Sequence, residues 1–335
     1  MGLRHPLTAA MLLCLLKPIS ASETDLDLGV HGFQAFSGLF EPSGVIQLQD
    51  ERLLVVEDEP SRAFVLLTPR PGTSTFGVDL LRSRSILETL LSGFGSGLDD
   101  LEALVLGPNK YIYAITSHSR QDNGKRDVKR EQLVRMTVDG NRIGQISIRR
   151  DMRNALVNAF TELKVSATER NVKDNAGLNI EGLTFNKDQD TLWIGFRAPL
   201  VEDKAILVGL NNLRDVFETD SSFEFSETLQ LLDLGGGGIR DIVFDSKLDG
   251  YLIISQREAD KKEKPFKLWF WNGSTKDSPR RVRIAGVKSL RRTEAIAPIT
   301  LGSENLLLLL SDEGDAKKQK NARVLIVDYA DLEID

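Results

Sequence analysis

The stretch that decides the fold covers Asn179–Pro199 and reads N-I-E-G-L-T-F-N-K-D-Q-D-T-L-W-I-G-F-R-A-P. It predicts two short antiparallel strands, Ile180–Phe185 and Thr191–Phe196, on either side of a polar turn. An acid, Glu181, lies at the start of the first strand, and a base, Arg197, follows the second strand 16 residues later.

This unit of strand, turn and strand returns in three further segments: Leu101–His118, Arg240–Arg257 and, more loosely, Thr293–Glu313. The interval of 16 residues between acid and base returns in two of them, as Glu102 with His118 and as Asp241 with Arg257. A supersecondary unit that recurs along a chain of short strands is typical of a β-propeller, in which each blade repeats the same antiparallel sheet.

We therefore predict an all-β fold, a single β-propeller domain of five blades formed by residues 22–335. The last blade lacks a fourth strand, while the strand predicted at Val30–Phe36 precedes the first blade without a partner. Because an open sheet edge invites aggregation, we expect Val30–Phe36 to pair with Arg323–Asp328 and to close the ring. A six-bladed ring, with a further blade built around Ser83–Gly97, is the alternative.

Two segments predict helices within this β-rich chain. In Arg150–Lys164 the apolar residues recur at steps of three and four, as expected for one amphipathic helix inserted between the second and third blades. The segment Asn211–Phe217 predicts a helical turn inside the third blade.

Residues 1–21 have the features of a secretory signal peptide. A weakly positive start at Arg4 and His5 precedes the apolar run Leu7–Leu16, which is too short to cross a bilayer. Small residues around Ala21 then offer a cleavage site. The only cysteine, Cys14, lies within this segment, so the mature chain cannot form disulfides or thiolate metal sites. We expect a periplasmic or secreted protein.

The mature chain is mildly acidic. Removal of Arg4 and Lys17 leaves 41 bases against 49 acids, a net charge of −8. This charge gives no attraction to nucleic acid. Beyond residues 1–21, no apolar run approaches the roughly 20 residues that a transmembrane helix needs. We expect a monomer whose partner is a small anionic molecule or a protein loop.

The repeated acids and bases define the candidate site. In a propeller the first strand of each blade lines the central channel and the second runs antiparallel to it, so the start of one and the end of the other emerge on the same face. We predict that seven side chains meet at one mouth of the channel: Glu102, His118, Glu181, Arg197, Asp241, Arg257 and Glu294. In the first blade, Ser43 takes the position of the acid.

Two interpretations of these side chains stay open. In one, each acid caps backbone amides or pairs with a neighbour and thereby holds adjacent blades in register; in the other, the converging groups bind a ligand. Carboxylates held close together attract a cation, and calcium suits the candidate metal ligands Glu181, Asp241, Glu294 and Asp312. Arg197 and Arg257 instead favour an anion such as a phosphate or a carboxylate, because the planar guanidinium matches these groups.

The segments E-G-L-T-F, L-W-I-G and F-R-A-P within Asn179–Pro199 resemble an uncharacterised family of secreted bacterial proteins, β-propellers akin to the esterase-like phytase group. The segments F-S-G-L-F-E-P-S-G-V (Phe36–Val45) and V-V-E-D-E (Val55–Glu59) fit the pattern of that broader group. The resemblance extends over nearly all of the mature chain, is most specific around Glu181 and Arg197, and implies a propeller fold.

No motif in the sequence fixes a reaction. The chain has no G-x-S-x-G nucleophile elbow, no H-E-x-x-H zinc motif and no phosphate-binding P-loop. The first hypothesis is a non-catalytic propeller whose charged channel mouth binds a small anion or a partner loop. The alternative is a hydrolase of phosphate or carboxylic esters, in which Glu181 is the general base and Arg197, with Arg257 and calcium, holds the anion.

Overall fold

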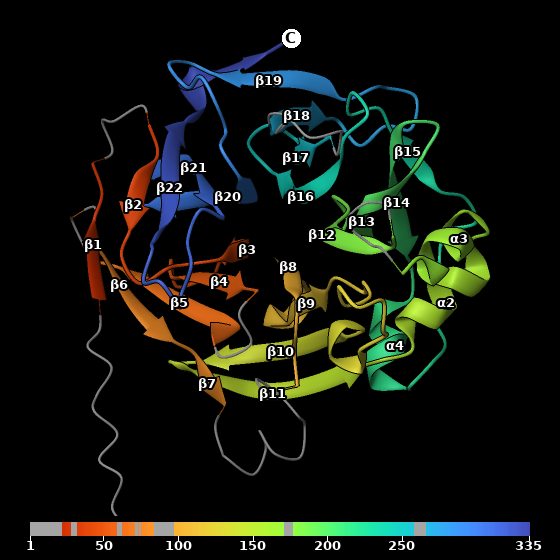
Figure 1. The fold of residues 1–335 in the computed structure, drawn as a ribbon. Coiled ribbons are helices and arrows are strands. Elements are labelled where there is room, and N and C mark those ends of the chain that lie inside the picture. The colour runs from red at the N-terminus through yellow and green to blue at the C-terminus, as the bar shows by residue number, and fades with distance from the viewer. Residues whose placement is uncertain are drawn as a thin grey trace, which may run out of the picture.

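The structure is a computed structural model that describes residues 22–27, 32–58, 62–70, 73, 75–83, 97–170, 177–257 and 266–335. Its strands form five sheets arranged around a central axis, which is a five-bladed β-propeller (Figure 1). The prediction of an all-β propeller with five blades rather than six is thus confirmed. Residues 84–96, most of the segment proposed for a sixth blade, lie outside the described residues, as does the predicted signal peptide.

In every blade the strands lie side by side, from an innermost strand at the central channel to an outermost one (Figure 1). Blade one contains β3 (Pro42–Gln47), β4 (Leu53–Glu57), β5 (Phe64–Pro69), β6 (Thr75–Leu80) and β1 (Ser22–Asp25). Blade two contains β8 (Leu101–Leu106), β9 (Ile112–Thr116), β10 (Leu133–Asp139), β11 (Arg142–Arg149) and β7 (Arg82–Ser83). Blade three contains β12 (Asn179–Phe185), β13 (Leu192–Val201), β14 (Lys204–Leu210) and β15 (Gln230–Leu232).

The remaining two blades complete the ring. Blade four contains β16 (Gly238–Asp245), β17 (Gly250–Gln256), β18 (Lys267–Trp271), β19 (Arg280–Ile284) and β23 (Leu332–Ile334). Blade five contains β20 (Thr293–Leu301), β21 (Glu304–Ser311), β22 (Ala322–Asp328) and β2 (Gln34–Phe36). Each blade is therefore an antiparallel meander, with short additional strands at the outer edge of blades one, two and four.

The inner strands are apolar on both faces because each blade packs against two neighbours. All five residues of β4 and all seven residues of β12 are buried. Among the described residues, the buried apolar side chains form five clusters, one at each junction between adjacent blades. The repeated Val, Leu and Ile runs of the sequence are thus the packing surfaces between blades.

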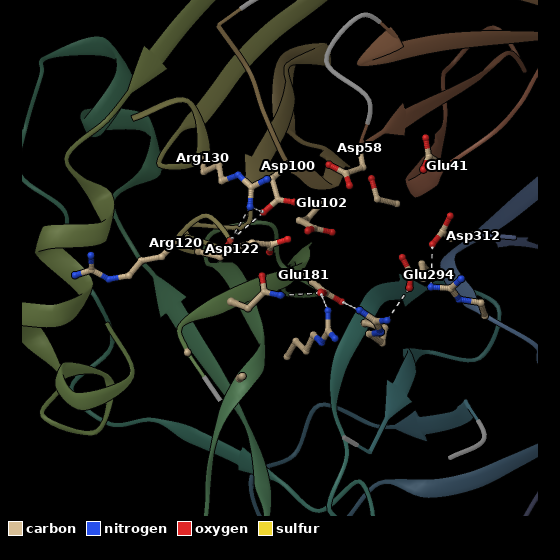
Figure 2. Close-up of a pocket in the computed structure, with 18 residues that line it drawn as sticks. Glu41, Asp58, Asp100, Glu102, Arg120, Asp122, Arg130, Glu181, Glu294 and Asp312 are labelled. Carbon is tan, nitrogen blue, oxygen red and sulfur yellow. Dashed lines mark hydrogen bonds and ion pairs between the residues drawn. The ribbon is translucent and has the colours of Figure 1, made fainter. Parts of the chain in front are cut away.

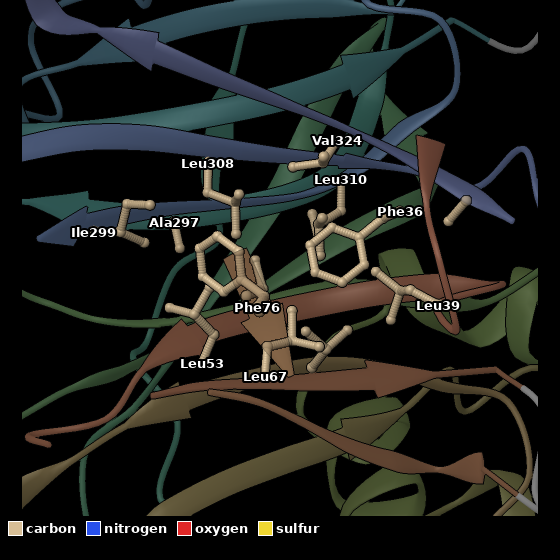
Figure 3. Packing of buried hydrophobic residues seen from close by; sticks show 14 of the residues in the cluster. Phe36, Leu39, Leu53, Leu67, Phe76, Ala297, Ile299, Leu308, Leu310 and Val324 are labelled. Carbon is tan, nitrogen blue, oxygen red and sulfur yellow. The ribbon is translucent and has the colours of Figure 1, made fainter. Parts of the chain in front are cut away.

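The ring closes through the amino-terminal strand, as predicted from the sequence. Strand β2 pairs antiparallel with β22, with Phe36 opposite Ala322. Phe36 is 1% exposed and its ring lies 5.9 Å from that of Phe76, between blades five and one (Figure 3). The predicted strand Val30–Phe36 begins earlier than β2, but its first two residues lie outside the described part of the chain.

Three outer strands were missed by the sequence analysis. Strand β1 adds to blade one, β7 runs parallel to the edge of blade two, and β23 adds to blade four after the chain has left blade five. Each has only two to four residues, too few for a period-two pattern to be recognised. Each is next in sequence to a strand of the adjacent blade, so these strands link neighbouring blades.

Two helices, α2 (Met152–Ala159) and α3 (Glu162–Thr168), replace the single helix predicted over Arg150–Lys164. The helix is interrupted because Phe160 has an extended backbone, with φ −122° and ψ 120°. Met152, Leu156, Phe160 and Leu163 are nevertheless all buried against blades two and three, so the predicted apolar face is correct.

The remaining helices are short. Helix α4 (Leu213–Glu218) confirms the predicted helical turn, and in the described part of the chain 3-10 helices cover Pro108–Lys110, Val128–Arg130 and Tyr329–Asp331. Among the described residues, no helix has the length and apolar character needed to cross a bilayer.

Candidate functional site

The innermost strand of every blade carries a β-bulge near its start. The pairing between first and second strand shifts register once in each of β3, β8, β16 and β20 and twice in β12. The residues left without an opposite partner are Ser43, Glu102, Glu181, Arg240 and Glu294. A bulge turns a side chain out of the regular alternation. Here it directs one side chain from each blade to the same end of the ring.

These five side chains line one cavity of about 500 Å³, the channel-mouth pocket. Its lining includes eight carboxylates, from Glu41, Asp58, Asp100, Glu102, Asp122, Glu181, Glu294 and Asp312. It also includes five guanidiniums, from Arg120, Arg130, Arg197, Arg240 and Arg292. The other lining residues are small or polar: Ser43, Ser119, Gly177, Asn179 and Ala198. None of the described lining residues is aromatic, so the pocket suits a strongly polar occupant.

A chain of ion pairs crosses the pocket from blade three to blade five (Figure 2). Arg240 donates from Nη1 to Oε2 of Glu181 at 2.6 Å and from Nη2 to Oε1 of Glu294 at 2.6 Å. The other carboxylate oxygen of Glu181 accepts from Arg197 Nη1 at 2.8 Å and from Asn179 Nδ2 at 2.9 Å. The side chains of Glu181 and Arg240 are only 3% and 7% exposed, so this network ties three blades together in a desolvated setting.

The two acids of this network differ in their ionisation. Burial alone would raise the pKa of Glu181, but the adjacent guanidiniums of Arg240 and Arg197 outweigh burial, and its pKa is lowered. Burial raises the pKa of Glu294 to about 7, because Arg240 compensates it only in part and Glu181 repels its negative charge. Glu181 is therefore a fixed anion, whereas Glu294 titrates near neutral pH.

A second group of acids occupies the side of the pocket formed by blades one and two (Figure 2). Arg130 binds Asp99 at 2.7 Å and Asp100 at 3.1 Å. Glu102 receives no hydrogen bond and no ion pair from any described residue. Burial raises its pKa well above the usual range, and the charges of Glu181 and Asp100 raise it further. At the rim of the pocket, partial desolvation and the charge of Asp100 also raise the pKa of Asp58.

The structure brings together four of the seven side chains predicted for the channel mouth. Glu102, Glu181, Arg197 and Glu294 all line the pocket, together with the metal-ligand candidate Asp312. Of the three predicted acid–base pairs at the 16-residue interval, only Glu181 and Arg197 are in contact. The prediction was wrong for His118, Asp241 and Arg257.

His118 lies inside the protein rather than at the pocket. Its backbone has a φ of 56°, and its side chain is completely buried. Nδ1 donates to the Thr116 carbonyl oxygen at 2.8 Å, and burial lowers its pKa to about 4, so the ring is neutral. The left-handed backbone turns the following residue, Ser119, toward the pocket instead.

Asp241 lies one residue beyond the bulge of blade four. Its carboxylate is buried and accepts hydrogen bonds from the backbone amides of Ile242 and Ile296, each at 2.8 Å, which joins blade four to blade five. This contact matches the interpretation in which acids hold blades in register. Arg257 is exposed and lines a separate depression of about 220 Å³ beside Gly235 and Gly236.

The main residue that sequence reasoning missed is Arg240. The segments I-E-G-L, L-E-A-L, T-E-A-I and P-S-G-V align on their apolar fourth residue, and I-R-D-I of blade four then places Arg240 with the glutamates. The sequence analysis assigned the acidic position of blade four to Asp241, although the other blades have Gly or Ala at the position that aligns with Asp241. By contrast, Asp58 and Asp100 lie in loops and Arg130 ends a short 3-10 helix, and such segments carry no periodic signal.

The described residues contain no group of three or more carboxylates and histidines arranged to hold a metal ion. Of the four predicted metal ligands, Glu181 and Glu294 are bound by Arg240, and Asp241 is bound by backbone amides. Calcium at this site stays a prediction from the sequence.

A comparison with protein families gives a match for this chain. Residues 101–328 match a family described as a protein of unknown function, DUF3616, and this match covers more than half of the 335 residues. The chain belongs to this family. A comparison with curated proteins gives no match.

Several solved structures share the general arrangement at low sequence identity. A glucose dehydrogenase from Thermus thermophilus is 12% identical with a TM-score of 0.38, covering 88% of this chain and 100% of that one. An exo-β-1,3-galactanase from Phanerochaete chrysosporium is 8% identical with a TM-score of 0.46, covering 90% and 66%. The allergen Mala s 1 of Malassezia sympodialis is 11% identical with a TM-score of 0.41, covering 86% and 79%. Likenesses at this level carry no argument about ligand or reaction.

Proposed function

We propose that this DUF3616 protein is a ligand-binding propeller whose channel-mouth pocket holds a small charged molecule. The observation that supports the proposal is the lining of the pocket: each blade contributes its bulged side chain, and thirteen ionisable side chains surround about 500 Å³. Charged side chains rarely converge in a partly desolvated cavity without a function, because their burial costs free energy.

Arg197 is the group that supports an anionic part of the ligand. Its side chain is 26% exposed, whereas that of Arg240 is 7% exposed, so Arg197 is the accessible guanidinium of the ion-pair network. A carboxylate or phosphate of the ligand would receive charge-assisted hydrogen bonds there. Carboxyl groups outnumber guanidiniums in the lining, eight to five, so a ligand that also carries a positive group gains partners that a simple anion does not.

A hydrolase of phosphate or carboxylic esters is the second candidate, as in the esterase-like phytase group that the sequence resembles. The observation in its favour is the pair Glu102 and Glu181, two carboxyl groups whose pKa values are shifted in opposite directions. In such an enzyme Glu102 is the better proton-transfer group, because both oxygens of Glu181 are bound by guanidiniums and its lowered pKa makes it a weak base. Arg197 would then stabilise the developing negative charge.

Calorimetric titration of the mature protein, residues 22–335, with acetate, phosphate, citrate and glycine tests the binding proposal. We expect at least one of these probes to bind, and Arg197→Gln to weaken that binding by at least about 10-fold, as loss of a charged hydrogen bond should do. Arg257→Gln, an exposed arginine outside the pocket, is the matched control and should bind as the wild type does. If no probe binds, or if Arg197→Gln has no effect, the proposal is wrong.

Assays with aryl phosphate, aryl ester and lactone substrates, with calcium and with chelator, separate the two candidates. Turnover that falls by at least about 100-fold in Glu102→Gln would favour the hydrolase, since general acid–base catalysis contributes on that scale. Binding without turnover would favour the non-catalytic function. We also propose that residues 1–21 direct export, so that the pocket acts in the periplasm or outside the cell.

A further inference from the structure

The channel-mouth pocket contains a carboxyl group that accepts no hydrogen bond from any described residue, that of Glu102. The guanidinium of Arg240 is held between two carboxylates, and that of Arg130 binds Asp99 and Asp100. By contrast, no described residue donates to the carboxyl group of Glu102, which lies across from Glu181 (Figure 2).

Asn179 provides a second, independent acceptor. Its side chain lines the pocket and is only 9% exposed. The side-chain nitrogen Nδ2 donates a hydrogen bond to Glu181. The other polar atom of the side chain is the carbonyl oxygen Oδ1. Among the described residues no group donates to this oxygen. A buried acceptor without a donor costs free energy, which a bound donor would recover.

On the basis of the proposed ligand-binding function, we propose that the ligand of this pocket carries a primary ammonium group. This group binds Glu102 and the carbonyl oxygen of Asn179. Together with an anionic group at Arg197, this makes the ligand a small zwitterion of the amino-acid type. An ammonium group supplies three donors and one positive charge, which suits two acceptors of which one, the carboxyl group of Glu102, can ionise and form an ion pair.

Two other classes of donor fit less well. A neutral hydroxyl group brings one donor and no positive charge, so it cannot form an ion pair with Glu102. A metal ion needs several oxygen ligands at about 2.0–2.6 Å, and the described residues contain no group of three acids and histidines arranged for this. The pocket also has no described aromatic residue that would favour a quaternary ammonium.

Binding of an ammonium group should be linked to proton release. Burial and the neighbouring charges raise the pKa of Glu102, so its carboxyl group holds a proton to higher pH than an exposed glutamate does. The ammonium group prefers the ionised carboxylate, so binding should expel that proton. Affinity should therefore rise with pH until the amine of the ligand itself loses its charge.

The test compares 4-aminobutyrate and 5-aminovalerate with 4-hydroxybutyrate and 5-hydroxyvalerate, which differ only in the amine. Calorimetric titration in two buffers of different ionisation enthalpy, across about pH 5 to 8, measures both affinity and proton release. We expect the amino acids to bind at least about 10-fold more tightly than the hydroxy acids. We also expect them to release protons on binding, and Glu102→Gln to abolish both the preference and the proton release.

Two further variants make the test specific. Asn179→Leu should reduce the preference for the amine but keep the proton release, because Glu102 is still present. Glu304→Gln removes an exposed acid at the start of β21 and should change neither quantity. Equal, Arg197-dependent binding of amino and hydroxy acids would refute the ammonium proposal while leaving the ligand-binding function intact. Binding of neither series by the folded protein would count against the ammonium proposal and against the ligand-binding function. Binding of Ca²⁺ without a preference for the amine would refute the ammonium proposal in favour of a metal site.

Discussion

Substitution of Phe36 by alanine tests how the propeller ring is closed. Phe36 ends β2, the strand that completes blade five, and its side chain is 1% exposed in the apolar cluster between blades five and one (Figure 3). The ring of Phe36 contacts that of Phe76, with 5.9 Å between their centroids. Alanine at this position keeps the backbone pairing of β2 with β22 but removes the side chain that anchors the strand.

We expect Phe36→Ala to lower the free energy of unfolding by about 3–5 kcal/mol, the range for a buried phenylalanine replaced by alanine. The full range applies because the side chain is buried between blades five and one, whereas β2, the outermost strand of blade five, pairs only with β22 and can shift to fill part of the cavity. With about 2 °C lost per kcal/mol in a large domain, the melting temperature should fall by about 6–10 °C.

Urea unfolding followed by tryptophan fluorescence, together with calorimetry, measures both quantities. The control is Val165→Ala, a change at an apolar residue that is 78% exposed on α3 and should leave the melting temperature nearly unchanged. Deletion of residues 22–37 removes β1 and β2 entirely, and the open edge of β22 should then cause aggregation. A monomeric deletion variant with wild-type melting, or a loss below about 1 kcal/mol for Phe36→Ala, would refute closure by this strand.

Three further predictions follow from the ion pairs, the titrating acids and the amino-terminal segment. Arg240→Met should lower the free energy of unfolding at neutral pH by about 3–5 kcal/mol, because it leaves buried carboxylates without their partner, whereas Arg257→Met should unfold as the wild type does. The pKa of Glu294 is raised to about 7 in the folded protein, so its contribution to stability is present at low pH and is lost as pH rises through neutrality. The fall in melting temperature between about pH 5 and 8 should therefore be smaller in Glu294→Gln than in the wild type. An unchanged dependence of the melting temperature on pH in this variant would contradict the prediction. Intact mass of the protein recovered after export from a bacterial host should correspond to cleavage after Ala21, and an uncleaved chain would contradict the assignment of a signal peptide.

The sequence by itself determined the architecture. The repeated apolar strand pairs, the missing fourth strand of the last blade and the spare strand before the first blade were sufficient to predict five blades and their closure. These features are readable because burial of both faces imposes a continuous apolar run on each inner strand, and because a ring cannot leave an edge unpaired. Part of the candidate site could be predicted for the same reason, since Glu102, Glu181 and Glu294 occupy the same place in three repeats.

Only the tertiary structure decided which charged groups meet. In blade four a bulge places Arg240 in the pocket and Asp241 against backbone amides, and a change of one residue in a strand reverses the side on which a side chain lies. The left-handed backbone of His118 similarly sends its ring into the interior. The partners of Arg240 lie 59 and 54 residues away in the sequence, and they decide that Glu181 is held as an anion while Glu294 titrates near neutrality. Electrostatic interactions depend on distances of a few ångströms and on burial, neither of which a local pattern of residues specifies.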